Sequence, residues 1–217
     1  MIDLSHYDAV IFDMDGVLVD SEPLWKIAMQ EVFSSLGSNL EKFDFQKTVG
    51  LRIDQVIAYW KPIENWDPEV KAIERQIITK MVDLIHHQSC PLSGVIETLD
   101  FLKSKTPIGL ATSSPQKLID AVLNTLDIKE YFDAIQSAET ETHGKPHPAV
   151  FLRAAKKMNV RPEKCLVIED SLNGIIAAKA ARMDVVCIPE KTHLPNPKMN
   201  VSDFRFENMN DFLNELK

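Results

Sequence analysis

The sequence predicts an α/β protein with a doubly wound, mostly parallel sheet of the Rossmann type, into which an all-helical domain is inserted. Three observations lead to this fold class. Five short runs are continuously apolar, helical patterns separate these runs from the second onward, and residues 21–90 carry helical patterns without a convincing strand. Strands that alternate with helices need crossover connections and form parallel sheets.

The five apolar runs are typical of strands that helices cover on both faces, because their residues do not alternate between apolar and polar. They are AVIF at 9–12, PIGLAT at 107–112, AIQSA at 134–138, CLVIE at 165–169 and DVVCI at 184–188. Apolar residues at helical spacing lie between or after them, at 114–126, 147–158 and 171–183.

The segment between the first two strands interrupts this alternation. Its helical patterns are clearest over 25–36, 52–60 and 68–85. A structureless loop of that length is implausible in a compact protein. We therefore expect a helical cap domain at residues 21–90, inserted in a core domain made of residues 1–20 and 91–217.

Composition excludes several classes of protein. The net charge of −8 disfavours a nucleic-acid-binding protein, and no apolar run approaches the roughly 20 residues of a membrane span. Cys90, Cys165 and Cys187 fit neither a disulfide framework nor a zinc site. We expect a reduced, cytoplasmic protein, and a monomer because no exposed amphipathic stripe is left over. Because the net charge is negative, an anionic substrate would need a site with local positive charge.

Polar residues gather at the ends of the predicted strands, where open parallel sheets bind their ligands. They are Asp13 and Asp15 after the first strand, Thr112, Ser113 and Ser114 at the second, Lys145 after the third, and Glu169 and Asp170 at the fourth. Because four strand ends deliver polar groups to one edge, we expect a single site there.

The carboxylates of Asp13, Asp15 and Asp170 cannot be buried together without a cation or strong donors. Oxygen ligands of this kind suit Mg²⁺. A calcium loop is the alternative for DMDG, since Glu22 lies six residues after Gly16. The apolar residues within that loop, and the strand where a helix should precede it, disfavour calcium.

A carboxylate can attack phosphorus and form an aspartyl-phosphate. Asp13 is the candidate nucleophile, and a metal would reduce its repulsion from an anionic ester. The Thr112 hydroxyl, the Ser113 amide and the Lys145 ammonium can bind the phosphate oxygens. Asp15 is then left to protonate the leaving oxygen and later to activate water.

The runs DMDGVLVDSEPLW, IGLATSS, GKPHP and IEDSLNG resemble, in order and spacing, the four motifs of the haloacid dehalogenase superfamily. The resemblance covers nearly the whole chain and places the insertion where that superfamily has its helical cap. It implies a nucleophilic Asp13 and an acid-base Asp15 whose backbone carbonyl binds Mg²⁺. It also implies that Glu169 and Asp170 form the fourth motif at the metal; of these two we expect Asp170 to bind the metal directly and Glu169 to be an outer partner.

Within the superfamily, SEPLW, VGLRIDQVIAYW and AARM are similar to the hexitol and 2-deoxyglucose-6-phosphate phosphatases of the β-phosphoglucomutase-like subgroup. The mutases carry a proton-shuttling histidine where this chain has Trp25. An indole does not exchange protons near neutral pH, so a phosphatase that acts on sugar or polyol phosphates is favoured. A phosphosugar mutase and a non-catalytic phosphosugar-binding protein are the alternatives.

Two residues of the predicted cap keep two interpretations each. Trp25 could stack on a sugar or pack in the core, and Arg52 could contact the substrate or form a surface ion pair.

Dehalogenation is disfavoured, because the dehalogenases lack the second aspartate, here Asp15. Phosphonate hydrolysis would need a cap lysine, for which Lys26 and Lys47 are weak candidates.

Overall fold

The computed structural model describes residues 2–39, 47–48, 50–190 and 196–217. Its sheet has six strands, all parallel, in the order β3-β2-β1-β4-β5-β6. They are β1 (Ala9–Phe12), β2 (Ile108–Thr112), β3 (Ala134–Ser137), β4 (Cys165–Glu169), β5 (Asp184–Cys187) and β6 (Phe204–Arg205). The predicted fold class is confirmed, and the five predicted strands are β1 to β5. Strand β6 was not predicted, because its two residues are too few for a periodic pattern.

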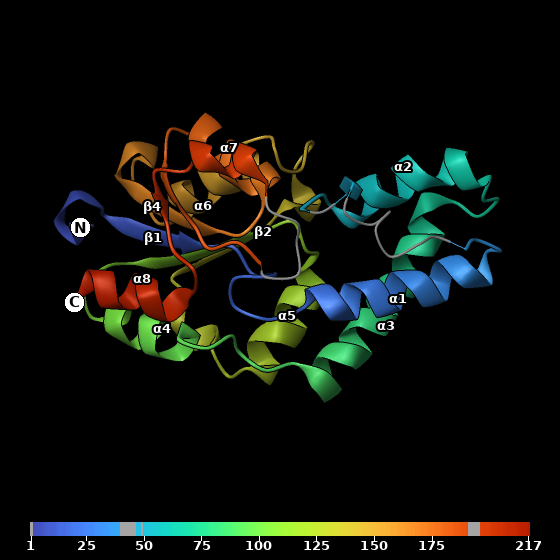
Figure 1. Cartoon of the computed structure of the whole chain (residues 1–217), viewed down its shortest axis with the longest axis horizontal. Coiled ribbons are helices and arrows are strands. Elements are labelled where there is room, and N and C mark those ends of the chain that lie inside the picture. Colours follow the sequence, from blue (N-terminus) through green and yellow to red (C-terminus); the bar gives the residue numbers. More distant parts are fainter. Residues whose placement is uncertain (1, 40–46, 49, 191–195) are drawn as a thin grey trace.

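Helices cover both faces of the sheet, with α6 and α7 on one side and α4, α5 and α8 on the other (Figure 1). They are α4 (Val95–Lys103), α5 (Gln116–Thr125), α6 (Ala149–Lys157), α7 (Leu172–Ala180) and α8 (Met209–Leu216). Strand β1 shows why its run is continuously apolar: Ala9 and Ile11 join one hydrophobic cluster, whereas Val10 and Phe12 join the other. Both faces of the strand are therefore buried.

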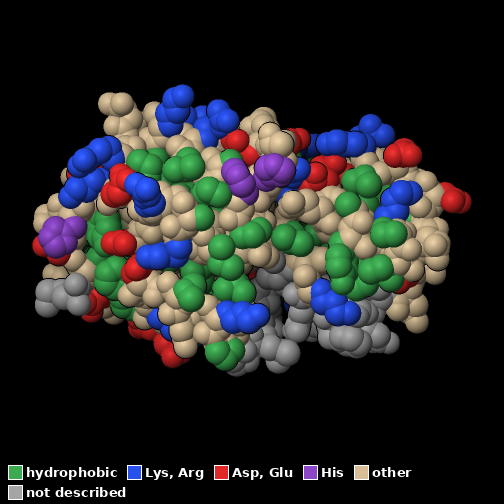
Figure 2. Space-filling view, turned by 90° about the horizontal axis from the view of Figure 1, so that it is seen from above, with side chains coloured by type: hydrophobic (Ala, Val, Ile, Leu, Met, Phe, Trp, Pro, Cys, Tyr) green, Lys and Arg blue, Asp and Glu red, His purple; other side chains and the backbone are tan. Residues whose placement is uncertain are grey.

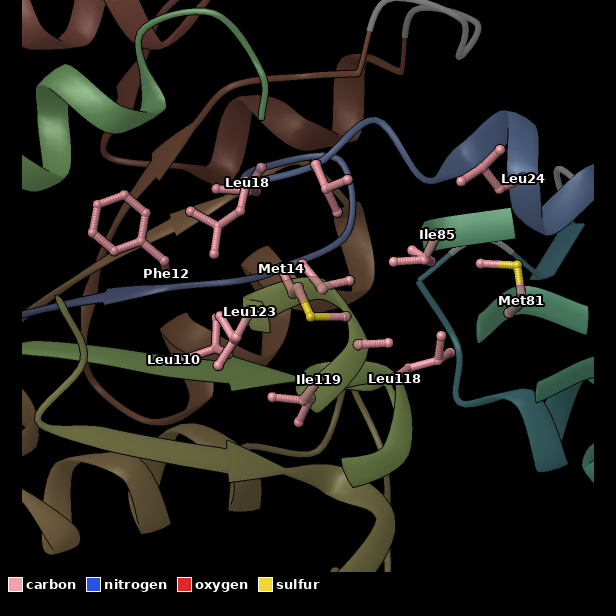
Figure 3. Close-up of a cluster of buried hydrophobic side chains, with 14 of the residues drawn as sticks. Phe12, Met14, Leu18, Leu24, Met81, Ile85, Leu110, Leu118, Ile119 and Leu123 are labelled. Atoms are coloured by element: carbon pink, nitrogen blue, oxygen red, sulfur yellow. The ribbon is translucent and has the colours of Figure 1, made fainter. Parts of the chain in front are cut away.

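The segment between β1 and α4 forms three long helices, α1 (Glu22–Ser35), α2 (Ile53–Glu64) and α3 (Val70–Gln88). Helices α1 and α2 pack against α3, and α3 packs against α5 of the sheet layer. The sheet and these helices share one hydrophobic cluster, in which Met81 and Ile85 of α3 lie with Leu24, Leu118 and Ile119 (Figure 3). The division into a core and a cap at residues 21–90 stays a prediction.

Short 3-10 helices complete the secondary structure. They are η1 (Leu4–His6), η3 (Lys129–Tyr131), η4 (Ala138–Thr140), η5 (Pro162–Lys164) and η6 (Pro197–Val201). Within the described ranges, no helix combines the length and the apolar composition needed to cross a membrane. On the face shown in Figure 2, small apolar patches alternate with acidic and basic side chains.

Candidate active site

A pocket opens at the carboxyl edge of the sheet, between the strand ends and residues of α1 and α2. The carboxyl ends of β1, β2 and β4 meet there because these strands are neighbours in the sheet. The end of β2 and the loops that follow β1, β2 and β4 contribute Asp13, Asp15, Gly16, Thr112, Ser113, Ser114, Pro115, Asp170 and Ser171 to the wall. Residues 21–56 contribute Ser21, Glu22, Trp25, Met29, Thr48, Gly50, Leu51, Ile53 and Val56. The predicted strand-end residues therefore converge on one site.

Asp13 lies at the floor of this pocket and is 6% exposed. Its backbone N–H donates to the carbonyl of Ile168 at 3.0 Å, which ties the end of β1 to β4. Its Oδ2 lies 2.9 Å from Nζ of Lys145. Its Oδ1 is buried and has no hydrogen-bond partner among the described residues. One oxygen of the carboxylate is thus held by a cation, and the other is left for a ligand.

Lys145 lies beneath Asp13 and is almost completely buried. Its Nζ also donates to Oε1 of Glu169 at 2.6 Å. Burial opposes the charge on this ammonium, but the carboxylates of Asp13 and Glu169 raise its pKa above the ordinary value. Lys145 is therefore a buried positive charge that the carboxylates of Asp13 and Glu169 compensate.

Glu169 has both carboxylate oxygens engaged. While Oε1 accepts from Lys145, Oε2 accepts from the N–H groups of Asp170 and Ser171 and from the Ser171 hydroxyl, each at 3.0 Å. Burial would raise the pKa of Glu169, but Lys145 and the Ser171 donors lower it below its usual value. A Cβ on Gly174 would lie 1.7 Å from Oε1, so only glycine fits beside this carboxylate.

The site has the composition of a divalent-cation site. Oxygen atoms of Asp13, Glu169 and Asp170 lie within 4.8 Å of one another, and all three residues are buried. Burial raises the pKa of Asp13 to about 8, with Lys145 opposing and Glu169 and Asp15 adding to the shift. Burial also raises the pKa of Asp170 well above its usual value, and Glu169 and Asp13 add to it. Such crowded carboxylates fit a metal ion with oxygen ligands.

The Asp15 carboxylate is surrounded by side-chain donors. Its Oδ1 accepts from Oγ of Ser21 at 2.5 Å and from Nε1 of Trp25 at 3.0 Å. Its Oδ2 accepts from Oγ of Ser114 at 2.7 Å and, at 3.5 Å, from Oγ1 of Thr112. Trp25 also packs against the hydrophobic cluster, as one of its two sequence interpretations expects, whereas its hydrogen bond to Asp15 was not expected. Ser21 was not predicted as a site residue, although it begins the SEPLW run.

Arg52 points away from the pocket. Its guanidinium donates to both carboxylate oxygens of Asp54, at 2.6 and 2.7 Å. Its Nη1 donates to the backbone carbonyls of Ala138 and Glu141, at 2.9 and 2.8 Å. The ion pair with Asp54 agrees with the second sequence interpretation. The two carbonyl contacts add a bridge from the start of α2 to the loop after β3.

A second contact joins the segment before α2 to the loop after β2, close to the site. The Ser113 hydroxyl donates to the Gly50 carbonyl at 3.4 Å. Gly50 has φ +75°, and a Cβ there would lie 2.8 Å from Oγ of Ser171. Glycine is therefore needed for both the backbone conformation and the close approach.

An open parallel sheet with a buried acidic cluster and a buried lysine at its carboxyl edge has the position and composition of an enzyme active site that uses a metal ion. The chain belongs to the haloacid dehalogenase-like hydrolase family, whose model matches residues 10–188. It is 37% identical to hexitol phosphatase B of Escherichia coli K12 over 206 residues, which cover 94% of this chain and 93% of the relative. It is 34% identical to a fructose-1-phosphate phosphatase of the same strain, over 83% of this chain and 95% of the relative.

Solved structures agree with this assignment. A β-phosphoglucomutase from Clostridium difficile superposes with a TM-score of 0.84 at 26% identity, over 97% of this chain and 96% of that one. CbbY from Rhodobacter sphaeroides, solved with phosphate, has the same fold at a TM-score of 0.84 and 23% identity, over 94% and 95% of the two chains. The family, the enzyme class and the predicted likeness to hexitol phosphatases are thus confirmed.

Proposed function

We propose that this protein is a Mg²⁺-dependent phosphatase that hydrolyses small phosphomonoesters through a phospho-Asp13 intermediate. Sugar or polyol phosphates, such as a hexitol phosphate or 2-deoxyglucose 6-phosphate, are the proposed substrates. The observation that carries the proposal is the Asp13 carboxylate, which faces the pocket with Oδ1 unpartnered among the described residues and Oδ2 fixed by Lys145. The phosphatase names of the similar curated proteins support the same reaction.

In the first step, an oxygen of Asp13 forms a bond to phosphorus while the bond from phosphorus to the ester oxygen breaks. Asp15 gives a proton to that leaving oxygen. Lys145 holds Asp13 in place, and the Thr112 hydroxyl and the Ser113 backbone amide offer donors to the phosphate. In the second step, water attacks the phosphoryl group, Asp15 takes the proton from the water, and the carboxylate of Asp13 is released.

Asp13 and Asp170, with the backbone carbonyl of Asp15, are the groups that would hold the metal. Glu169 is proposed as an outer partner, because its two oxygens already accept from Lys145 and from the Asp170 and Ser171 donors. Bound Mg²⁺ would neutralise charge on the phosphate and on the carboxylate that attacks it.

The lining of the pocket near Asp13 suits a phosphate ester whose alcohol part has both apolar surface and hydroxyl groups. Trp25, Met29 and Leu51 give that lining apolar surface, while Glu22 and Thr48 add polar atoms. A mixed lining of this kind is common in sites for small organic ligands. It matches a sugar or polyol better than a purely apolar ester.

A phosphosugar mutase is the second candidate, favoured by the similarity to the β-phosphoglucomutase structure. Trp25 disfavours it, because the indole cannot act as the second proton shuttle. A non-catalytic phosphosugar-binding role is set aside, since the chain belongs to a hydrolase family.

A phosphate-release screen over sugar, polyol and nucleotide monophosphates with Mg²⁺ tests the proposal. We expect release from sugar or polyol phosphates, and a loss of at least about 10³-fold in Asp13→Asn, which lacks the nucleophile. Asp120→Asn, on the exposed side of α5, is the matched control. An unchanged rate in Asp13→Asn would refute the nucleophile. Interconversion of glucose 1-phosphate and glucose 6-phosphate without phosphate release would favour the mutase.

We also propose that the protein is a cytoplasmic monomer. Its core domain would comprise residues 1–20 and 91–217, and its cap domain residues 21–90. The three free thiols support a reducing compartment. The large exposed apolar side chains are spread over five elements, with Tyr59 and Ile63 sharing α2, and this spread supports a monomer: Ile27, Tyr59, Ile63, Leu152, Ile176 and Val201. Light scattering after size exclusion would measure the oligomeric state.

A further inference from the structure

The two oxygens of Asp15 have chemically different partners, and the partners come from different parts of the fold. Oδ1 accepts from Ser21 and Trp25, at the start of α1. Oδ2 accepts from Ser114 and Thr112, at the end of β2. The carboxylate is therefore oriented by two elements at once.

The indole N–H donates and cannot accept, so the Trp25 contact requires Oδ1 of Asp15 to be an acceptor. Hydroxyl groups can rotate and either donate or accept. When Asp15 carries a proton, Oδ2 can present it to a neighbouring hydroxyl or substrate oxygen, because Ser114 and Thr112 can turn. A proton on Oδ1 that points toward Trp25 would face another donor.

The Trp25 ring is fixed by its surroundings. Its backbone N–H donates to the carbonyl of Ser21 at 2.9 Å, and its side chain packs against the hydrophobic cluster. The same residue lines the pocket, so its hydrogen bond lies at the edge of the space that a substrate would fill. An indole held in this way presents its N–H in one direction.

We propose that Trp25 is a positioning residue, which holds Oδ1 of Asp15 as an acceptor and leaves Oδ2 to exchange the proton with the leaving group and with water. This inference rests on the proposed function. In the first step the proton passes from Oδ2 to the ester oxygen, as the bond from that oxygen to phosphorus breaks and the bond from Asp13 forms. In the second step a proton of the attacking water returns to Oδ2, and the bond between phosphorus and Asp13 breaks.

The test compares two leaving groups, because only a poor one needs the proton. An alkyl leaving group, as in a hexitol phosphate, requires protonation, whereas p-nitrophenolate leaves without it. We expect Trp25→Phe to lower kcat/KM for hexitol phosphate about tenfold more than kcat/KM for p-nitrophenyl phosphate. Complete removal of a general acid lowers the rate roughly 10²–10⁴-fold, and this sets the upper bound for the effect of Trp25→Phe.

Trp60→Phe is the matched control. The Trp60 indole is buried in α2, and its Nε1 has no partner among the described residues. The ratio of the two kcat/KM values should stay at the wild-type value in this variant. If Trp25→Phe does not fold, benzothienylalanine at position 25 keeps the ring shape and replaces only the N–H by sulfur.

Each outcome separates this inference from the proposed function. Equal losses for both esters, or no loss for either, in a variant of a working enzyme would overturn the positioning role alone. A wild-type protein that releases phosphate from neither ester would overturn the proposed function together with this inference. A selective loss for the hexitol phosphate supports both.

Discussion

Nζ of Lys145 lies 2.6 Å from Oε1 of Glu169, and both side chains are at most 1% exposed. A buried ion pair of this kind adds little to the stability of the folded state compared with an apolar pair. Removal of one partner, however, leaves the other charge buried and uncompensated. Asp13 is the second carboxylate on the same ammonium. The position of the proposed nucleophile therefore depends on a charge that Glu169 helps to hold.

Glu169→Gln should lower the free energy of unfolding by about 3 kcal/mol, because it removes one of the two charges that compensate buried Lys145. Urea denaturation followed by circular dichroism measures this change. Glu163→Gln is the control, since Glu163 faces Arg182 across 3.7 Å on the surface and such pairs contribute little. Equal urea midpoints for both variants would contradict the structural role of Glu169.

Gly174→Ala should destabilise the protein, although alanine is the better helix former. The added Cβ would lie 1.7 Å from Oε1 of Glu169 and would force that carboxylate away from Lys145. Gly37→Ala is the comparison: its φ of +89° makes alanine strained, but the space around it is open. We expect a lower thermal midpoint for Gly174→Ala than for Gly37→Ala. The reverse order would show that α7 can shift to accept a side chain.

Arg52→Ala should loosen the contact between α2 and the loop after β3, because it removes the donors to the Ala138 and Glu141 carbonyls. Amide hydrogen exchange should rise at the start of α2 in this variant. Arg75→Ala, at an exposed position of α3, should leave exchange there at the wild-type level. Unchanged exchange in Arg52→Ala would mean that the bridge contributes nothing to the contact.

Two of the three thiols should be unreactive in the native protein. Burial raises the pKa of Cys165 to about 12, with Asp8 and Glu163 adding to the shift. Burial raises the pKa of Cys187 to about 11, partly opposed by Arg205. Because a raised pKa keeps a thiol protonated at pH 8, both lack the reactive thiolate there.

A disulfide exchange reagent at pH 8 should therefore label only Cys90, which is exposed. Three thiols per chain should react after denaturation in guanidinium. In the native Cys90→Ser variant, the reagent should label no thiol. Labelling of all three cysteines in the native protein would contradict their burial.

Removal of divalent metal by chelation should abolish phosphate release, and added Mg²⁺ should restore it. Binding should also raise the thermal midpoint, because a ligand of the folded state stabilises that state. Asp170→Asn should lose most of this rise, since it removes a charged oxygen from the cluster with Asp13. A wild-type midpoint that does not respond to Mg²⁺ would count against the metal site, independently of any assay of activity.

Most of the fold could be predicted from local pattern. The continuous apolar runs indicated strands buried on both faces, and all five lie within one residue of the structure. The edge strand β6 was missed because two residues show no period and its pairing with β5 is a long-range contact. The sheet order, in which β1 lies between β2 and β4, likewise depends on contacts between distant segments.

The convergence of the candidate site also followed from the sequence. Asp13, Thr112 and Asp170 each come at the end of an apolar run, and parallel strands bring such ends to one edge. Side-chain directions did not follow, because they depend on packing between segments that are far apart in the chain. Arg52 points to backbone carbonyls near position 140 rather than into the pocket.

The sequence by itself determined the chemistry of the site: which carboxylates, which lysine and which strand ends are available. Only the tertiary structure decided how these groups are shared. It turned both oxygens of Glu169 toward donors, left Oδ1 of Asp13 without a hydrogen-bond partner among the described residues, and placed the Trp25 indole on Asp15. The physical reason is that a hydrogen bond depends on distance and direction to within fractions of an ångström, and those are fixed only when α1, β1, β2 and β4 pack together.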